Sequence, residues 1–221
     1  MDGHHMSHAA TATEPSPAAL AKLEADKRFS EFNHQFAGLF VLLAGLLTLL
    51  EPQLAKRFAF IRYLWFLFFL IPGMYLFILS DDESWPVGSQ TLRYVITTNH
   101  QVLQHKIFSL ILLGLAVIEF LRVHKKLQAL WTAALFPAIA ASGAALLLFH
   151  AHPGPPGAMN ESAHLAMQKI EHQHVGFAVV GFGIALSKAA VDLGQFNTRL
   201  MRSVFAVLMV VLGILLLTYT E

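Results

Sequence analysis

The side chains of this chain that are best suited to chemistry are its twelve histidines, which gather at the borders of long apolar runs. Five of them stand between residues 146 and 176, in the sequence LLLFHAHPGPPGAMNESAHLAMQKIEHQHVG. The chain has no cysteine, so histidine, methionine and carboxylate side chains are the metal ligands it can offer. Neutral imidazole is a nitrogen ligand for copper, zinc, nickel and iron. The pattern therefore indicates a metal site built from histidines.

Three histidines recur at a nearly constant interval. His34, His105 and His174 stand 71 and 69 residues apart, in FNHQF, LQHKI and EHQHV, and each comes at the expected start of an apolar helix. If these three helices enter a bundle from the same side, their first turns share one depth. We therefore expect the three imidazoles to form one layer that binds a metal ion. Any one of them alone would more simply bond a backbone carbonyl at a helix end.

Further ligands are expected from neighbouring segments. His150 and His152 form one His-X-His pair, His172 forms a second with the layer residue two positions later, and Asp81 follows another apolar run. Residues two apart on a helix point about 200° away from each other, so such a pair chelates only where the chain leaves helical geometry. We expect both pairs to straddle helix ends, and we expect Asp81 or one of these histidines to be a fourth ligand or to orient the others.

The elements that must position these residues are membrane helices. The chain is 56% hydrophobic and 13% charged, with a mean hydropathy of +0.57, whereas soluble domains are about 25% charged. Each of six apolar segments is long enough to cross a bilayer as a helix, and none alternates with the period of a barrel strand. We expect an all-α, polytopic membrane protein whose spans lie near residues 34–50, 58–80, 103–121, 129–151, 174–191 and 203–220.

A repeat relates these segments. Gly73, Gly143 and Gly213 are each 70 residues apart in the second, fourth and sixth segments, in step with the histidine interval. Such a period predicts three consecutive helical hairpins of one structural unit. The six-helix domain then covers residues 34–221. Residues 1–33 form a polar His- and Met-containing tail, with a short interfacial helix expected over residues 18–32.

Basic residues set the expected orientation. The three short turns 51–62, 122–128 and 188–202 hold nine of the fifteen Lys and Arg residues. The positive-inside rule places these turns in the cytoplasm and both chain ends on the outer side. Eleven of the twelve histidines then face outward, and His124 is the exception. We expect Glu119, one turn before Arg122, to pair with that arginine near the inner side.

The histidine segments resemble a known family. LQHKI, FHAHPG and IEHQHVGF, in their positions on a multi-helix membrane protein with a His- and Met-containing exterior, resemble the bacterial integral-membrane copper-resistance protein D (CopD) family. The resemblance extends from about residue 32 onward, although six expected helices are fewer than that family has. It implies a protein of the bacterial inner membrane that binds copper, transports or transfers it, and receives it from a periplasmic copper-binding partner.

Two other functions remain open at this stage. A b-type haem protein for electron transfer would need one axial histidine on each of two facing helices, and His105 with His174, or His34 with His150, could serve. The near absence of histidine on the inner side favours copper over transmembrane electron flow. A structural subunit of a membrane complex is the second alternative. We expect no enzyme, because hydrolase and nucleotide motifs are missing, and no nucleic-acid partner, because a net charge of +1 gives no basic stripe.

Overall fold

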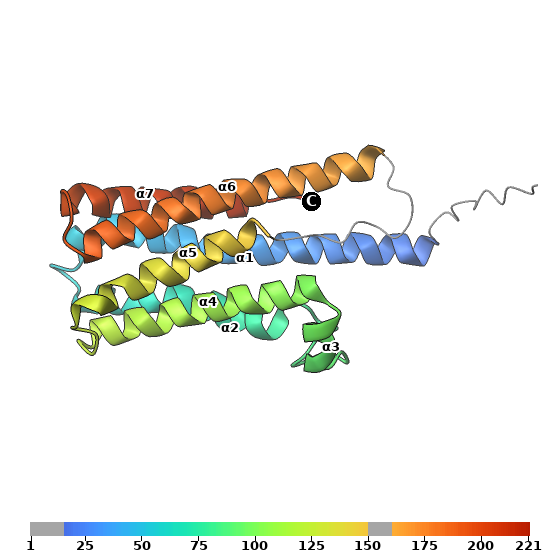
Figure 1. Cartoon of the computed structure of the whole chain (residues 1–221), viewed down its shortest axis with the longest axis horizontal. Coiled ribbons are helices and arrows are strands. Elements are labelled where there is room, and N and C mark those ends of the chain that lie inside the picture. Colours follow the sequence, from blue (N-terminus) through green and yellow to red (C-terminus); the bar gives the residue numbers. More distant parts are fainter. Residues whose placement is uncertain (1–15, 150–160) are drawn as a thin grey trace, which may run out of the picture.

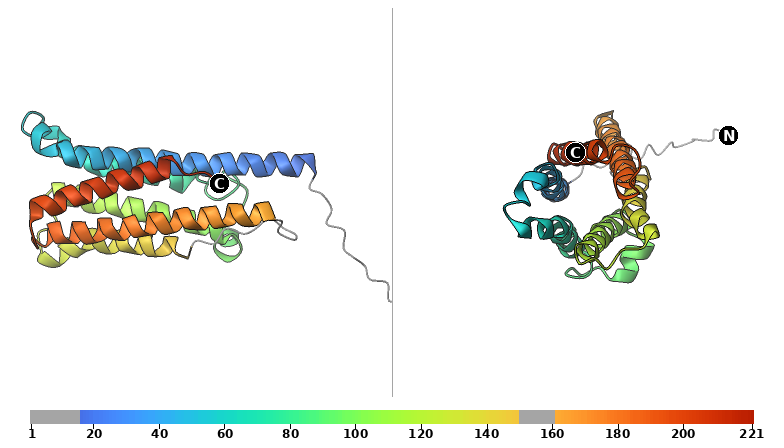
Figure 2. Two further views of the ribbon diagram at one scale, coloured as in Figure 1. Left: turned by 90° about the horizontal axis from the view of Figure 1, so that it is seen from above. Right: turned by 90° about the vertical axis from the view of Figure 1, so that its left-hand side faces the viewer.

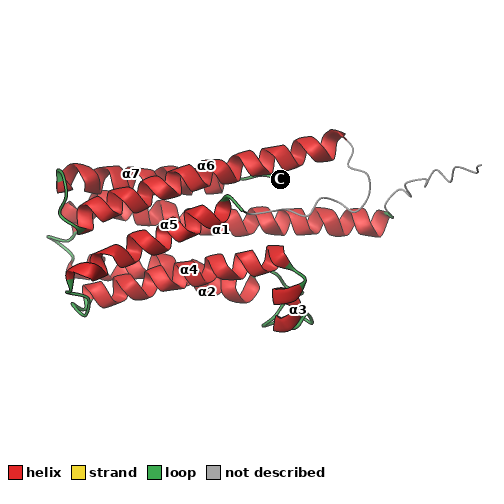
Figure 3. Cartoon of the chain, viewed as in Figure 1, coloured by secondary structure: helices red, strands yellow, loops and turns green. Residues whose placement is uncertain are grey.

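The computed structural model describes residues 16–149 and 161–221, and this part of the chain is all-helical (Figure 3). Its long helices run nearly parallel to one another and form one elongated bundle (Figure 1). Strands are absent from the described residues, where a single isolated bridge joins Ser84 to Gln90 in a loop. The predicted all-α class is therefore confirmed.

The first helix, α1, extends from Pro17 to Leu54. It begins where the Ser16 side chain accepts a hydrogen bond from the Ala19 amide at 3.2 Å, and Pro17 occupies the first helical position, which needs no donor. The interfacial helix expected over residues 18–32 is helical, but it continues into the first apolar segment without a break. Hydropathy marks where the apolar segment begins, whereas a helix continues into water wherever its residues have a high helix propensity.

The other helices follow in chain order. The two short 3-10 helices are η1 (Ala59–Tyr63) and η2 (Leu130–Ala134), and the α-helices are α2 (Leu64–Leu79), α3 (Leu92–Thr97), α4 (His100–Val123), α5 (Leu135–Leu147), α6 (Glu161–Asp192) and α7 (Thr198–Leu217). Asn99 and Asn197 cap α4 and α7, each accepting from the amide three residues on. Gly194, with φ of +66°, makes the turn between α6 and α7.

Six helices form a closed ring. Their order around the ring is α1, α2, α4, α5, α6 and α7, and α7 packs back onto α1 through the most extensive interface of the bundle. The end view shows this ring, with α3 beside it (Figure 2). The α1–α2 and α4–α5 interfaces are the sparsest. Among the described residues, helices on opposite sides of the ring do not approach each other closely, so side chains and cavities occupy the axis.

The α1–α7 interface is close because of glycine. A Cβ on Gly213 would lie 2.5 Å from the backbone nitrogen of Leu42, and one on Gly45 would lie 2.8 Å from that of Val210. Real Cβ atoms do not approach backbone so closely, so only glycine fits at these two positions. Small residues allow membrane helices to pack backbone against backbone, as they do here.

The outside of the ring is apolar. In the described part of the chain, five helical stretches are long and apolar enough to cross a membrane: Pro17–Leu54, Phe60–Leu79, Leu130–Leu147, His164–Asp192 and Thr198–Leu217. Leu186, Val179 and Val207 are among many large apolar side chains that point outward, as lipid-facing residues do. These features are consistent with a multi-pass membrane protein. The segment expected over residues 103–121 forms α4 in the same ring but is not among the five, so six spans remain a prediction.

Candidate functional site

The three spaced histidines meet in the interior of the bundle. His34 comes from α1, His105 from α4 and His174 from α6. The ring centroid of His34 lies 6.3 Å from that of His105 and 5.8 Å from that of His174, with both neighbouring rings nearly perpendicular to it. The expectation that these residues share one depth is thus confirmed, and His34 is the ring neighbour of both others.

Backbone carbonyls orient two of these imidazoles. Nδ1 of His34 lies 2.9 Å from the carbonyl oxygen of Ser30, and Nδ1 of His174 lies 2.8 Å from that of Ile170, one turn earlier in each helix. In the neutral form, a hydrogen bond to a carbonyl requires the proton on Nδ1, which leaves the lone pair on Nε2. This second hydrogen bond is the usual support of a metal-binding histidine.

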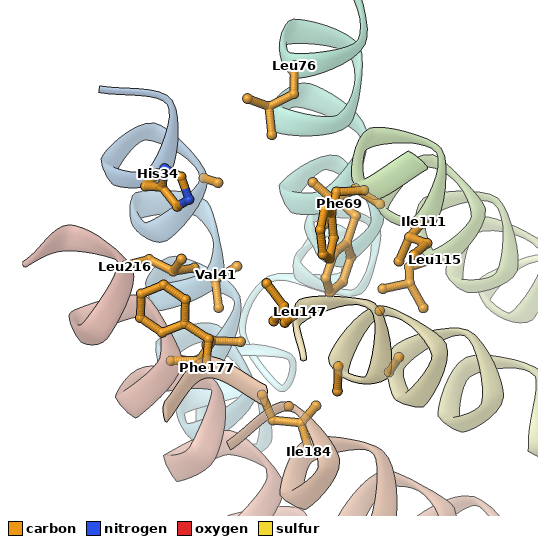
Figure 4. Close-up of a pocket in the computed structure, with 18 of the residues that line it drawn as sticks. His34, Val41, Phe69, Leu76, Ile111, Leu115, Leu147, Phe177, Ile184 and Leu216 are labelled. Carbon is orange, nitrogen blue, oxygen red and sulfur yellow. The ribbon is translucent and has the colours of Figure 1, made fainter. Parts of the chain in front are cut away.

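A cavity opens next to the histidines along the axis of the ring. Its volume is about 220 Å³, and all six ring helices contribute to its wall. Polar atoms come from the three histidines and from Ser30, Asn33 and Ser80. The remaining lining is apolar, with Val41, Phe69, Ile111, Phe177 and Ile184 among the side chains drawn in Figure 4. Small residues of α5 leave space for the cavity on that side of the ring, namely Ala140, Gly143 and Ala144.

The expectation that the layer histidines start their helices is wrong. His34 lies in the middle of α1 and His174 in the middle of α6, because both helices begin well before the apolar segment. The same correction applies to His172, which does not straddle a helix end. It lies within α6, exposed, on a different face from the buried His174. His150 and His152 fall outside the described residues.

Asp81 has a structural role in the loop after α2. Its Oδ1 accepts hydrogen bonds from the backbone amides of Glu83 at 3.0 Å and Ser84 at 3.1 Å, which closes a tight turn. Burial raises the pKa of Asp81 above its usual value, while the two amide hydrogen bonds act in the opposite direction. The hydrogen bonds of Asp81 lie within this loop.

Three-ligand metal geometry is not formed within residues 16–149 and 161–221. No group of three or more His, Asp or Glu side chains there is arranged to hold one metal ion. The layer is better described as two histidine pairs that share His34. An ion about 2 Å from one nitrogen of each of two imidazoles needs ring centroids about 5 to 6.5 Å apart, and both pairs meet this requirement.

Sequence reasoning missed Tyr219. This residue follows α7, is completely buried, and stacks on His34 with a centroid distance of 3.9 Å and an interplanar angle of 24°. Its ring also lies 5.8 Å from that of His174. A lone tyrosine beyond the end of an apolar run carries no periodic signal, and its place depends on how α7 packs against α1.

A buried ion network occupies the opposite end of the ring. Arg122 of α4 lies 3.2 Å from Glu119 and 2.6 Å from Asp192 of α6, and Lys188 lies 2.6 Å from the same Asp192. The predicted Glu119–Arg122 pair is therefore confirmed. All four side chains are mostly buried, next to a second cavity of about 210 Å³. Charges of both signs are balanced within this network.

Aromatic rings separate the two cavities. Trp65, Phe69, Phe136 and Phe205 pack together, with centroid distances between 5.0 and 6.1 Å. Phe69 and Phe136 line the histidine cavity, whereas Trp65 and Phe205 line the charged one. The Lys188 ammonium group lies 5.3 Å from the ring centre of Phe136. The histidine cavity thus ends at an aromatic layer with a cation behind it.

Comparisons of the chain with protein-family models, with curated proteins and with solved structures found no match. They therefore do not identify the copper-resistance protein D family, and that resemblance remains a prediction. The described residues form an all-helical bundle around a histidine-lined cavity, and several of the helices are able to span a membrane.

Proposed function

We propose that this protein is an integral membrane protein that binds copper through His34, paired with His105 and His174. The observation that supports the proposal best is the approach of three imidazoles from three different helices at one end of an internal cavity. Packing alone does not require three histidines in contact inside an apolar bundle, because each one is costly to bury. Their proximity therefore needs a ligand to explain it.

Copper suits this donor set. The chain has no thiolate, and imidazole nitrogen binds copper well. Copper(I) accepts as few as two ligands, which matches two histidine pairs sharing one member. His150 and His152 are candidates for completing the site, and His172 and Asp81 remain candidates only if the outer segments rearrange. The proposed role is to receive copper from a periplasmic copper-binding protein and to transfer or transport it.

Four purified variants test the site. Copper bound per protein is measured by mass spectrometry after equilibration with copper(I) in detergent, for the parent and for His34→Ala, His105→Ala, His174→Ala and His172→Ala. His34→Ala is expected to lose the most, because both pairs contain this residue. His172→Ala is the matched control, since it removes an exposed histidine from the same helix as His174. Equal copper content in all variants would refute the proposal that these histidines bind copper.

Proton competition gives an independent check on the ligand type. An imidazole in water titrates near pH 6.5, and a protonated ring cannot bind a metal. Copper affinity is therefore expected to fall between about pH 7.5 and 5.5 and to recover on return to neutral pH. An affinity that stays constant over this range would indicate ligands other than histidine.

We also propose an orientation and a repeat. The turns rich in Lys and Arg lie in the cytoplasm, both chain ends lie on the periplasmic side of a bacterial inner membrane, and the ring consists of three hairpins, α1–α2, α4–α5 and α6–α7. The arrangement of these hairpins in chain order around the ring supports the repeat. A periplasm-sensitive reporter attached after Glu221 is expected to be active, and activity of only a cytoplasmic reporter would reverse the orientation.

A second candidate is b-type haem, because the cavity is larger than a bare ion needs. Apart from the histidines and a few other polar residues, the wall of the cavity is apolar, which suits an apolar occupant. His34 and His105 would hold the haem iron, Ala140 and Gly143 line the space beside them, and the group would supply one-electron chemistry.

Filling the cavity separates the two candidates. Ala140→Phe is expected to block a macrocycle while leaving the imidazoles in place for copper. An absorption spectrum of the purified parent, with a Soret band lost in Ala140→Phe, would support haem. Copper binding that survives this substitution would support the bare ion. A protein that binds neither would be left with the structural-subunit role.

A further inference from the structure

The three residues 219–221, here called the histidine strap, lie against the histidine layer. After α7 ends at Leu217, the chain brings Tyr219 under His34, with the two rings stacked at 3.9 Å. Tyr219 has no exposed surface, and its ring is also 6.1 Å from that of Phe177. The tyrosine therefore forms one wall of the layer.

Hydrogen bonds anchor the strap to α1. Oε1 of Glu221 accepts from the hydroxyl of Tyr219 at 3.0 Å and from the hydroxyl of Ser30. The backbone amide of Glu221 donates to the carboxylate of Glu31 at 2.9 Å. Ser30 also supplies the carbonyl that faces Nδ1 of His34. One turn of α1 thus holds both the strap and the imidazole.

A second set of hydrogen bonds anchors the strap to α6. The amide side chain of Gln173 donates to the carbonyl of Thr220 at 2.9 Å and accepts from its amide at 3.3 Å. Lys169 donates to the Thr220 hydroxyl at 2.6 Å. Gln173 immediately precedes His174, so the strap connects the two helices that carry the closer histidine pair.

Two contacts together fix the direction of a metal-binding nitrogen. The hydrogen bond at Nδ1 holds one atom of the His34 ring, but the ring could still rotate about that point. Stacking against Tyr219 fixes the plane of the ring. The hydroxyl of Tyr219 donates to Glu221 at 3.0 Å, which holds the tyrosine ring in this position.

From these contacts we propose that Tyr219 is a positioning residue of the metal site, which holds the His34 ring in the plane that directs Nε2 toward the bound metal. This inference rests on the proposed function, because it takes the His34 site as metal-binding. Tyr219 acts through His34 and not as a ligand, since its hydroxyl is engaged by Glu221. Partners of this kind change metal affinity by about 10- to 100-fold when they are removed.

Three variants test the inference with copper as the probe. Tyr219→Leu removes the ring and is expected to weaken copper(I) binding by about 10- to 100-fold, measured by competition with a chromogenic copper(I) chelator. Tyr219→Phe keeps the ring and is expected to stay within about threefold of the parent, because a stacked ring needs no hydroxyl. Tyr63→Leu is the matched control, since Tyr63 packs beside His124 at the other end of the protein.

The spectrum of bound copper(II) distinguishes positioning from general damage. If Tyr219 positions His34, the fraction of Tyr219→Leu that still binds copper has altered nitrogen hyperfine couplings in electron paramagnetic resonance, and Tyr219→Phe restores the parent spectrum. Parent-like couplings in Tyr219→Leu, with copper lost only in proportion to unfolded protein, would overturn the inference while leaving the copper site intact.

A metal-independent measurement keeps the inference separate from the proposed function. Diethylpyrocarbonate modifies accessible imidazoles, and peptide mapping reports the rate at His34 in protein without metal. Removal of the stacked ring in Tyr219→Leu is expected to raise this rate several-fold, while Tyr63→Leu leaves it unchanged. An unchanged rate in Tyr219→Leu would overturn the inference. A parent protein that binds no copper, with a raised rate in Tyr219→Leu, would overturn the proposed function but support the placement of His34 by Tyr219.

Discussion

The glycine at position 213 offers a sharp test of the ring. In Gly213→Ala, the new Cβ would lie 2.5 Å from the backbone nitrogen of Leu42 and 2.7 Å from its Cα. Backbone cannot rotate away as a side chain can, so α7 and α1 must separate along their whole interface. Overpacking of this kind costs about 1–3 kcal/mol, and a clash with backbone belongs at the upper end. The better helix propensity of alanine returns at most about 1 kcal/mol.

The same substitution elsewhere in the 70-residue pattern has a different expected result. A Cβ on Gly143 would meet Ile111 at 3.5 Å, an ordinary contact, so Gly143→Ala is expected to be neutral or slightly stabilising. A Cβ on Gly73 would lie 3.0 Å from the Leu113 side chain, which can shift. Gly73→Ala is therefore expected to destabilise the protein more than Gly143→Ala and less than Gly213→Ala. Replacing Gly176, which has nothing within 4 Å, controls for helix propensity alone.

Thermal unfolding in detergent, followed by tryptophan fluorescence, measures this series. For a chain of this length, about 1 kcal/mol shifts Tm by about 2–4 °C. Gly213→Ala is therefore expected to lower Tm by several degrees, Gly73→Ala by less, and Gly143→Ala not at all. If Gly143→Ala and Gly213→Ala lowered Tm equally, the close contact between α7 and α1 would be refuted.

Two further predictions concern charged groups away from the histidines. Arg122→Met leaves Lys188 as the one cation of the network beside the carboxylates of Glu119 and Asp192. The substitution is expected to destabilise the protein by about 3 kcal/mol, measured by the same thermal assay. An unchanged Tm would contradict the burial of that network. Because the pKa of Asp81 is raised in the folded state, the stability it contributes is full below about pH 3.8 and is lost as pH rises through the raised value. Asp81→Asn keeps the acceptor for the turn without the charge, so it should gain stability relative to the parent as pH rises toward 7, and a pH-independent difference would refute the shift.

The gathering of the three histidines could be predicted because it depends on quantities that sequence contains. The near-constant interval of about 70 residues places His34, His105 and His174 each at the border of an apolar segment. Such borders share one depth when the helices pack into one bundle, and the three rings do lie close together. The pairing of Glu119 with Arg122 is local to one helix and equally readable.

Other parts of the site depend on tertiary packing that no local pattern encodes. The contact of Arg122 with Asp192 joins α4 and α6, which α5 separates in the ring, so it depends on how the whole ring closes. The place of Tyr219 needs α7 to close the ring against α1. The sequence also predicts helix starts that are too late, because hydropathy marks only the edge of the apolar segment. Helix α6 begins at Glu161, well before that edge.

The closure of the ring by α7 against α1 bears on how the protein is made. Among the helices of the described residues, α1 is synthesised first and α7 last, and the glycine face of α1 at Gly38 and Gly45 fits α7. Contacts so distant in sequence form slowly, so this face stays open to lipid or to other nascent chains throughout synthesis. A product that ends before α7 would therefore leave the glycine face of α1 without its partner helix.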